Sequence, residues 1–166
     1  MSSIPEVSAI LAGFVLAHAV WSVSDLPEGE LLVPLAMVEV SGERHLQRFE
    51  AATQEQAIAA GKAAMQRVLS TGAVWAFARD GRFSRDGRSV DVISVDFWGK
   101  GMTEPATVVQ EYQPAAHPGG FRLLGEPLLV IDGVAQSPAT ARVVLAQIRS
   151  GIQSHSKASA LWNSRP

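Results

Sequence analysis

The stretch from residue 73 to residue 98, AVWAFARDGRFSRDGRSVDVISVDFW, constrains the fold more than any other part of the chain. Its two arms are rich in Val, Ile, Phe and Trp, and two Asp-Gly steps lie between them, a pattern that predicts a β-hairpin. With the turn placed near residues 83–84, Trp75 lies across from Val92, and both faces of the hairpin are apolar. Helices on only one side would leave the other face open. We therefore expect the sheet either to curl around a pocket or to be covered by a second molecule.

Length and composition indicate one globular domain. A chain of 166 residues lies in the size range of a domain that buries its own core, and its 47% hydrophobic and 18% charged residues are those of a folded protein. A formal net charge of −2 provides no overall attraction to nucleic acid or anionic lipid. The chain has no cysteine, which excludes disulfides and thiolate chemistry and fits a cytoplasmic location.

The apolar segment of residues 7–23 is typical neither of a signal peptide nor of a membrane span. No basic residue precedes Arg44, so the positive start of a signal peptide is missing, and Glu6 carries the opposite charge. Polar residues and a glycine interrupt a run that is barely long enough to cross a bilayer. The apolar residues recur at helical spacing, which predicts a helix packed inside a soluble domain.

The other elements follow from capping and turn signals. Thr53 and Gln56 have the spacing of a capping box and predict a helix over residues 53–70. Pro34 marks the apolar segment 31–40 as an edge strand, because proline donates no hydrogen bond to a neighbouring strand. Further strands are expected at 43–50, 105–112, 121–124 and 128–131, and a last helix is expected at 137–152.

The resulting order is α-β-β-α-β-β-β-β-β-α. This order predicts an α+β domain with an antiparallel sheet of about five to six strands and helices packed on one face. We expect a single α+β domain over residues 1–155 and a C-terminal tail at 156–166. Many unrelated small domains share such an arrangement, so it points to no particular family.

One group of candidate residues suits a protein partner. It comprises four arginines of the hairpin loop, the aromatic residue among them and two apolar residues of the tail: Arg79, Arg82, Phe83, Arg85, Arg88, Leu161 and Trp162. Arginine beside an exposed aromatic residue is typical of interfaces. The alternative is a soluble hairpin cap, in which the Asp-Gly steps shape the turn and the arginines supply solubility. The tail is expected to dock onto its own domain or onto a neighbouring molecule.

The alternative site is a pocket between sheet and helices, with two histidines and two carboxylates as candidates: His18, Asp91, Glu111 and His117. His117 lies in a Pro/Gly loop close to Glu111 in sequence, where a carboxylate would orient the ring for acid–base chemistry. His18 lies on the apolar stripe of the first helix, which favours a position in the core or at a pocket edge. Asp91 and Asp96 lie on opposite faces of one strand and so do not form a catalytic pair.

These patterns favour a non-enzymatic protein-interaction or assembly module, which self-associates as a homo-oligomer or binds a protein partner. No cofactor motif is present and the four histidines lack metal-ligand spacing, so we expect no cofactor, metal, nucleic acid or membrane partner. The alternative is a small-ligand-binding domain or a small enzyme with a pocket in a cone-like α+β fold. A ligand site requires that the candidate side chains converge on one concave pocket, which distinguishes the two hypotheses.

Overall fold

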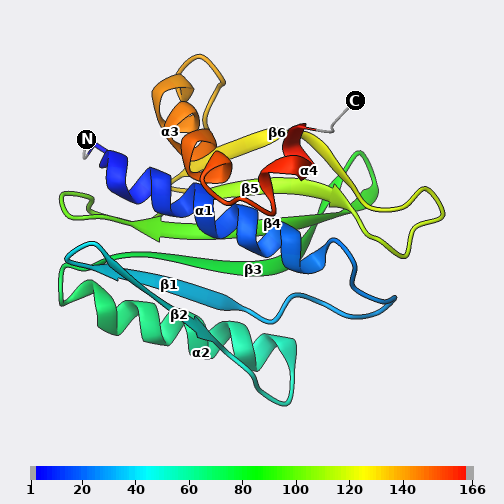
Figure 1. Cartoon of the computed structure of the whole chain (residues 1–166), viewed down its shortest axis with the longest axis horizontal. Helices are drawn as coiled ribbons and strands as arrows, with labels where there is room; N and C mark the ends of the chain where they lie inside the picture. The colour runs from blue at the N-terminus through cyan, green and yellow to red at the C-terminus, as the bar shows by residue number, and fades with distance from the viewer. Residues whose placement is uncertain (1–2, 164–166) are drawn as a thin grey trace.

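A computed structural model describes residues 3–163, which form a seven-stranded antiparallel sheet with helices packed against it (Figure 1). The strands lie in the order β2-β1-β3-β4-β5-β6-β7. In chain order the elements are α1 (Glu6–Val23), β1 (Leu35–Val40), β2 (Glu43–Arg48), α2 (Gln54–Leu69), β3 (Val74–Arg85), β4 (Arg88–Trp98), β5 (Ala106–Gln113), β6 (Arg122–Ile131), β7 (Val134–Ala135), α3 (Arg142–Gln153) and α4 (Ser159–Asn163).

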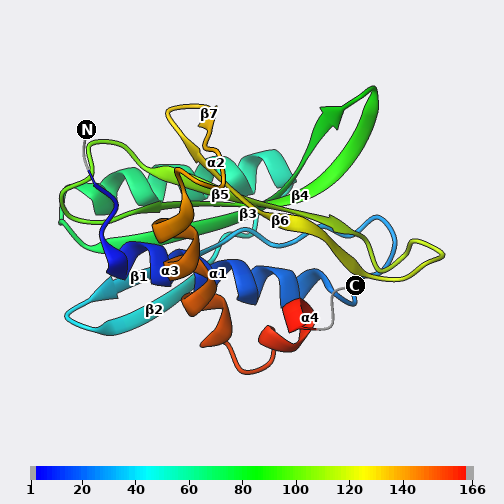
Figure 2. The ribbon, with the colours of Figure 1, turned by 90° about the horizontal axis from the view of Figure 1, so that it is seen from above.

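The α+β class, the antiparallel sheet and the order of elements are confirmed, with seven strands instead of five to six. The placement of the helices differs from the expectation, because they do not share one face of the sheet. Figure 2 shows α1 and α3 on one side of the sheet and α2 on the other. α2 packs on β1 and β3, and it lies close to the sheet because Gly61 faces the ring of Phe77. A Cβ atom at Gly61 would lie only 2.5 Å from Cζ of that ring.

The hairpin of β3 and β4 turns later than expected. Asp86 and Gly87 alone form the turn, with φ angles of 51° and 75°, the left-handed values that a type I′ turn requires. Trp75 therefore lies across from Trp98 instead of Val92, six residues further along β4. Six is an even number, so every side chain of the hairpin stays on the face of the sheet that was expected.

α1 is the central helix of the core. By length and composition it is apolar enough to cross a membrane, yet most of it is buried between the sheet and α3. The two helices touch through their backbones at two glycines. A Cβ atom at Gly13 would overlap the carbonyl oxygen of Ile148, and one at Gly151 would overlap that of Ile10. α3 thus packs on the side of α1 that is turned away from β3 and β4.

β6 is one strand, where two short strands had been expected. Between Leu124 and Leu128, three residues of β6 bulge opposite the single residue Gln110 of β5. The Gln110 side chain is fully buried and fills this bulge, because its Nε2 donates hydrogen bonds to the carbonyl oxygens of Leu124 and Gly125 at 3.3 and 3.1 Å. The glycine and proline of residues 125–127 therefore interrupt the pairing and leave the strand continuous.

The edges of the sheet are β2 and β7. β1 is an inner strand between β2 and β3, not the edge strand that Pro34 suggested, because β1 begins one residue after this proline. All six residues of β2 are exposed, and their sequence ERHLQR is largely charged and polar. Such an edge hinders the addition of a further strand.

The C-terminal segment packs back onto its own domain. α4 lies against β6, Ala158 is fully buried and Trp162 is 8% exposed. Leu161 packs against the same core. Of the two docking modes expected for the tail, the structure shows the one within the chain, and residues 164–166 lie outside the described residues.

Candidate functional site

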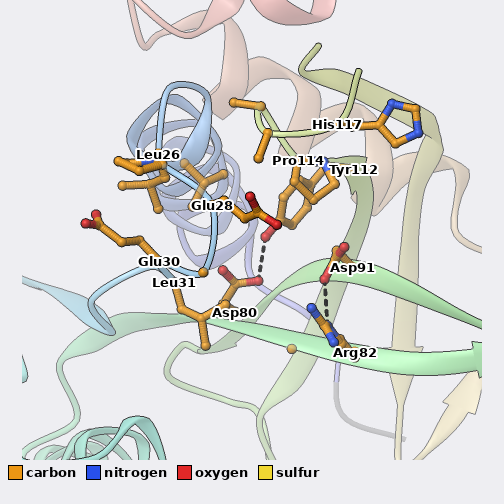
Figure 3. A pocket seen from close by; sticks show the side chains of 16 residues that line it. Leu26, Glu28, Glu30, Leu31, Asp80, Arg82, Asp91, Tyr112, Pro114 and His117 are labelled. Atoms are coloured by element: carbon orange, nitrogen blue, oxygen red, sulfur yellow. Dashed lines mark hydrogen bonds and ion pairs between the residues drawn. The ribbon is translucent and has the colours of Figure 1, made fainter. Parts of the chain in front are cut away.

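A cleft of about 720 Å³ lies beyond the end of α1 (Figure 3). The connection from α1 to β1 and the loop after β5 form its sides, and β3, β4 and β5 form its floor. Its polar groups come from strands and loops alike: Glu28, Glu30, Asp80, Arg82, Asp91, Tyr112 and His117. The remaining lining is apolar or glycine: Val23, Leu26, Pro27, Gly29, Leu31, Gly81, Pro114, Ala115 and Ala116.

Asp80 and Tyr112 form a buried pair on the floor of this cleft. The Tyr112 hydroxyl donates to Oδ1 of Asp80 at 2.7 Å, and the Leu32 backbone N–H donates to Oδ2 at 3.2 Å. Asp80 is 5% exposed and Tyr112 is 6% exposed. The sheet brings them together, because Asp80 pairs with Ile93, and Ile93 pairs with Gln110, two residues before Tyr112 and on the same face.

Burial changes the acid–base properties of this pair. It raises the pKa of the Asp80 carboxyl, while the hydrogen bonds from Tyr112 and Leu32 act in the opposite direction and the nearby Asp91 carboxylate raises it further. Burial and the hydrogen bond to Asp80 together raise the pKa of the Tyr112 hydroxyl. Tyr112 therefore keeps its proton and serves as the hydrogen-bond donor of the pair.

Asp91 lies on the same floor and forms an ion pair with Arg82, with 3.0 Å between Oδ1 and Nε. The Arg82 side chain is 69% exposed, whereas the Asp91 side chain is 20% exposed. Asp96 lies on the other face of the sheet, where its Oδ2 is 2.6 Å from Nη1 of Arg79. The alternation of side chains along β4 therefore separates Asp91 from Asp96, and it is Asp80 that shares a face with Asp91.

The cleft collects two of the four pocket candidates. Asp91 and His117 line it, whereas Glu111 lies on the opposite face of the sheet and forms an ion pair with Arg85. His117 is exposed at the rim, its Nδ1 accepts the N–H of Gly119 at 3.0 Å, and its ring points away from the floor of the cleft (Figure 3). Glu111 therefore does not orient the His117 ring.

His18, the fourth candidate, lies outside the cleft and contacts a second histidine. Its Nδ1 is 3.1 Å from Nε2 of His155, which precedes α4. Nδ1 of His155 accepts the N–H of Ala158 at 3.1 Å, so a neutral His155 carries its proton on Nε2 and donates it to His18. The rings of Phe14 and Trp21 pack around the two imidazoles.

Both histidines favour the neutral state. Burial lowers the pKa of His18, and the positive charges that His155 and Arg48 can carry lower it further. Burial also lowers the pKa of His155, as does nearby Lys157. The pair is therefore an uncharged contact that joins α1 to the C-terminal segment near neutral pH.

The arginines of the hairpin are engaged within the chain. Three of them pair with carboxylates of β4 and β5: Arg79 with Asp96, Arg82 with Asp91 and Arg85 with Glu111. The Arg85 guanidinium also lies over the ring of Phe83, 5.4 Å from its centre. Arg88, next to the turn, is exposed. Three of the four arginines are thus held by contacts within the domain.

Two residues of the cleft, Asp80 and Tyr112, were not among the candidates from the sequence. Placing the turn near residues 83–84 assigned Asp80 to a loop, although it lies well inside β3. The available signal was the second Asp-Gly step, at residues 86 and 87. Taken as a two-residue turn, it extends both arms and places Asp80 on the apolar face of a strand.

Neither metal ligation nor similarity to other proteins assigns a function to the cleft. Residues 3–163 contain no group of three or more His, Cys, Asp or Glu side chains that could hold a metal ion. Comparison with models of protein families, with curated proteins and with solved structures finds no match for this chain. The function of the cleft is therefore inferred from its own geometry.

Proposed function

We propose that this chain is a small-ligand-binding protein whose site is the cleft beyond the end of α1. The supporting observation is a concave space of about 720 Å³ with the buried Asp80–Tyr112 pair on its floor. Ligand sites in proteins are usually preformed hollows of about 300–1,000 Å³, mostly apolar, with a few convergent polar groups. The cleft has each of these features.

The polar groups of the cleft lie on rigid elements. Asp80 belongs to β3, Asp91 to β4 and Tyr112 to β5, and these strands are neighbours in the sheet. The covering segments, by contrast, are connections without helix or strand. A site with its polar groups on strands and its cover on loops holds a ligand in a defined orientation and still lets it enter.

Side-chain packing supports a protein partner less well than it supports a ligand. Three of the four hairpin arginines already bind carboxylates of this chain, and Trp162 is 8% exposed. An interface that used these groups would first have to break contacts within the domain.

Binding to the cleft is testable by NMR with ¹⁵N-labelled protein and a library of small organic fragments. We expect fragments to shift amide signals of the cleft, such as those of Gly29, Gly81 and Ala115. The variant Ala115→Trp places a large side chain at the cleft wall and should abolish these shifts. Ala146→Trp, on an exposed position of α3, is the matched control and should leave them unchanged. Fragments that shift signals only elsewhere would contradict the proposal.

A second function, self-association, is favoured by an open sheet face. α2 packs on β1 and β3, and Figure 2 shows the same face of β4, β5 and β6 extending beyond it. Five partly or largely exposed apolar side chains lie on this face, Val90, Val109, Leu124, Leu128 and Val130, beside polar ones such as Ser94, Thr107 and Glu111. A second copy of the chain would bury them.

The test of self-association is the solution mass. We expect analytical ultracentrifugation to show a dimer for the native protein and a monomer for Leu128→Asp, since a carboxylate at this position would be buried in the contact. Val143→Asp changes the charge equally at a residue of α3 that is 65% exposed, and it should leave the mass unchanged. A native protein that is monomeric at high concentration would exclude this second function.

A further inference from the structure

We infer that the cleft binds an organic cation, a protonated amine on an apolar body, whose charge lies against the carboxylate of Asp80. This inference rests on the proposed function and specifies the chemical class of its ligand. The structure supports it in three steps, which concern the charge of Asp80, the charges around it and the apolar wall.

Asp80 is a buried acid without a counter-charge. Its carboxylate accepts hydrogen bonds from the Tyr112 hydroxyl and from the backbone N–H groups of Leu32 and Gly81, and within residues 3–163 it forms no ion pair. All three donors are uncharged. Buried charges in proteins are nearly always paired, because a carboxylate taken out of water without a cation is unfavourable. A positive group that enters the cleft would supply the missing partner.

The surroundings of Asp80 add negative charge. Arg82, the arginine that lines the cleft, is already bound to Asp91. Glu28 and Glu30 lie on the connection that covers the cleft, and Figure 3 shows the Glu28 side chain pointing toward Tyr112. The cleft thus holds four carboxylates against one arginine, an excess that attracts cations and repels anions.

The ligand also needs an apolar part. Leu26, Leu31 and Pro114 lie around the cleft near Asp80 (Figure 3), and Val23, the last residue of α1, also lines it. An apolar group placed among these side chains would be removed from water, while its ammonium group reaches the carboxylate. A bare metal ion lacks such a part, and the described residues offer no set of three metal-binding side chains. The geometry therefore points to an amine.

The test compares matched probes on the full chain. Phenethylamine, 2-phenylethanol and 3-phenylpropionate share one body and differ in charge, and a second set uses tryptamine, tryptophol and indole-3-propionate. We expect the amines to shift the cleft amides of ¹⁵N-labelled protein and to bind about tenfold more tightly than the alcohols, with the carboxylates binding least.

Two variants locate the charge that is responsible. Asp80→Asn removes it with little change of shape and should reduce amine binding to the level of the alcohols. If this variant does not fold, Glu28→Gln keeps the floor intact and should weaken amine binding alone, by about twofold. Glu43→Gln, an equal change on the exposed edge strand β2, is the control and should have no effect.

The outcomes separate the two proposals. If alcohols or carboxylates shift the cleft amides as strongly as the amines do, the proposed ligand class is wrong, although the cleft is still the binding site. If no probe of either set shifts cleft amides at millimolar concentration, both the ligand class and the binding function are rejected.

Discussion

Replacement of Gly151 by alanine tests whether α1 and α3 meet through their backbones. A Cβ atom at this position would overlap the Ile10 carbonyl oxygen and lie 2.9 Å from the carbonyl carbon, against about 3.4 Å or more for ordinary contact. The helices would have to separate by more than about 0.5 Å, the difference of these two distances. Because the overlapped atoms belong to the backbone, no rotation of a side chain can relieve the overlap, and Gly13 makes the same approach to the Ile148 carbonyl from α1.

Two opposing effects decide the sign of the change in stability. Alanine favours a helix over glycine by about 1 kcal/mol. Against this, a gap of about 0.5–1 Å loses a quarter to a half of the dispersion energy across the contact, and overpacked cores lose about 1–3 kcal/mol. Ile148 and Ile152, which meet Gly13 at this contact, are buried, so we take the upper value. The expected net loss is about 2 kcal/mol, or a fall in Tm of roughly 4–8 °C for a chain of this length.

Urea unfolding followed by circular dichroism measures this loss. Ser150→Ala, on the exposed side of α3, is the control and should change stability by less than about 0.5 kcal/mol. The double variant Gly13→Ala/Gly151→Ala should lose less than the sum of the single variants, because the first alanine already separates the helices. If Gly151→Ala instead stabilised the protein by about 1 kcal/mol, as helix propensity alone predicts, the backbone contact would be refuted.

Three further predictions concern the histidine pair, the bulge and the turn. Because burial lowers the pKa of both His18 and His155 in the folded chain, the unfolded chain takes up protons first, and the free energy of unfolding should fall as the pH drops below about 6.5. Urea unfolding at several pH values should show a smaller fall for His18→Gln/His155→Asn, whose asparagine still accepts the Ala158 N–H; an equal fall would contradict the assignment. Gln110→Leu removes the hydrogen bonds that Nε2 donates to the carbonyl oxygens of Leu124 and Gly125, and it should lower the free energy of unfolding by about 2 kcal/mol, with faster amide exchange in β5 and β6. Unchanged exchange would count against these hydrogen bonds. Gly87→Ala should lower the stability measured by thermal unfolding by about 1 kcal/mol, because φ is 75° at this residue. Gly87→Asn should lower it clearly less, and equal losses for the two variants would argue against a left-handed turn.

Local patterns predicted the elements because each element carries its own signal. The Thr53 hydroxyl accepts the Gln56 N–H at 3.1 Å, as the capping box indicated, and α2 begins there. The arms of the hairpin alternate as strands do. The turn was ambiguous because two Asp-Gly steps stand in one loop, and both satisfy the same backbone requirement. Placing the turn between them, near residues 83–84, gave a register that assigned Asp80 to a loop, whereas a turn at the second step assigns it to the floor of a cleft.

Relations between distant segments could not be predicted. The amphipathic pattern of α2 identifies which side of the helix is buried, but it does not say on which face of the sheet the helix lies. His18 and His155 are 137 residues apart, and the sequence around either histidine does not indicate that the two are in contact. Asp80 and Tyr112 meet only after three strands have paired. The cleft therefore depends on contacts between segments that are far apart in the chain, and a single sequence does not reveal such contacts.

The position of α1 in the chain has a consequence during synthesis. α1 ends at Val23, and α3, which covers it, ends at Gln153, 130 residues later. At about 5–20 residues per second, the ribosome needs roughly 6 to 26 seconds to complete the partners of this helix. Throughout this interval an apolar segment with the length of a membrane span is without its native cover. Chaperone binding to the nascent chain should therefore concentrate on α1, and it should end only when α3 has left the ribosome.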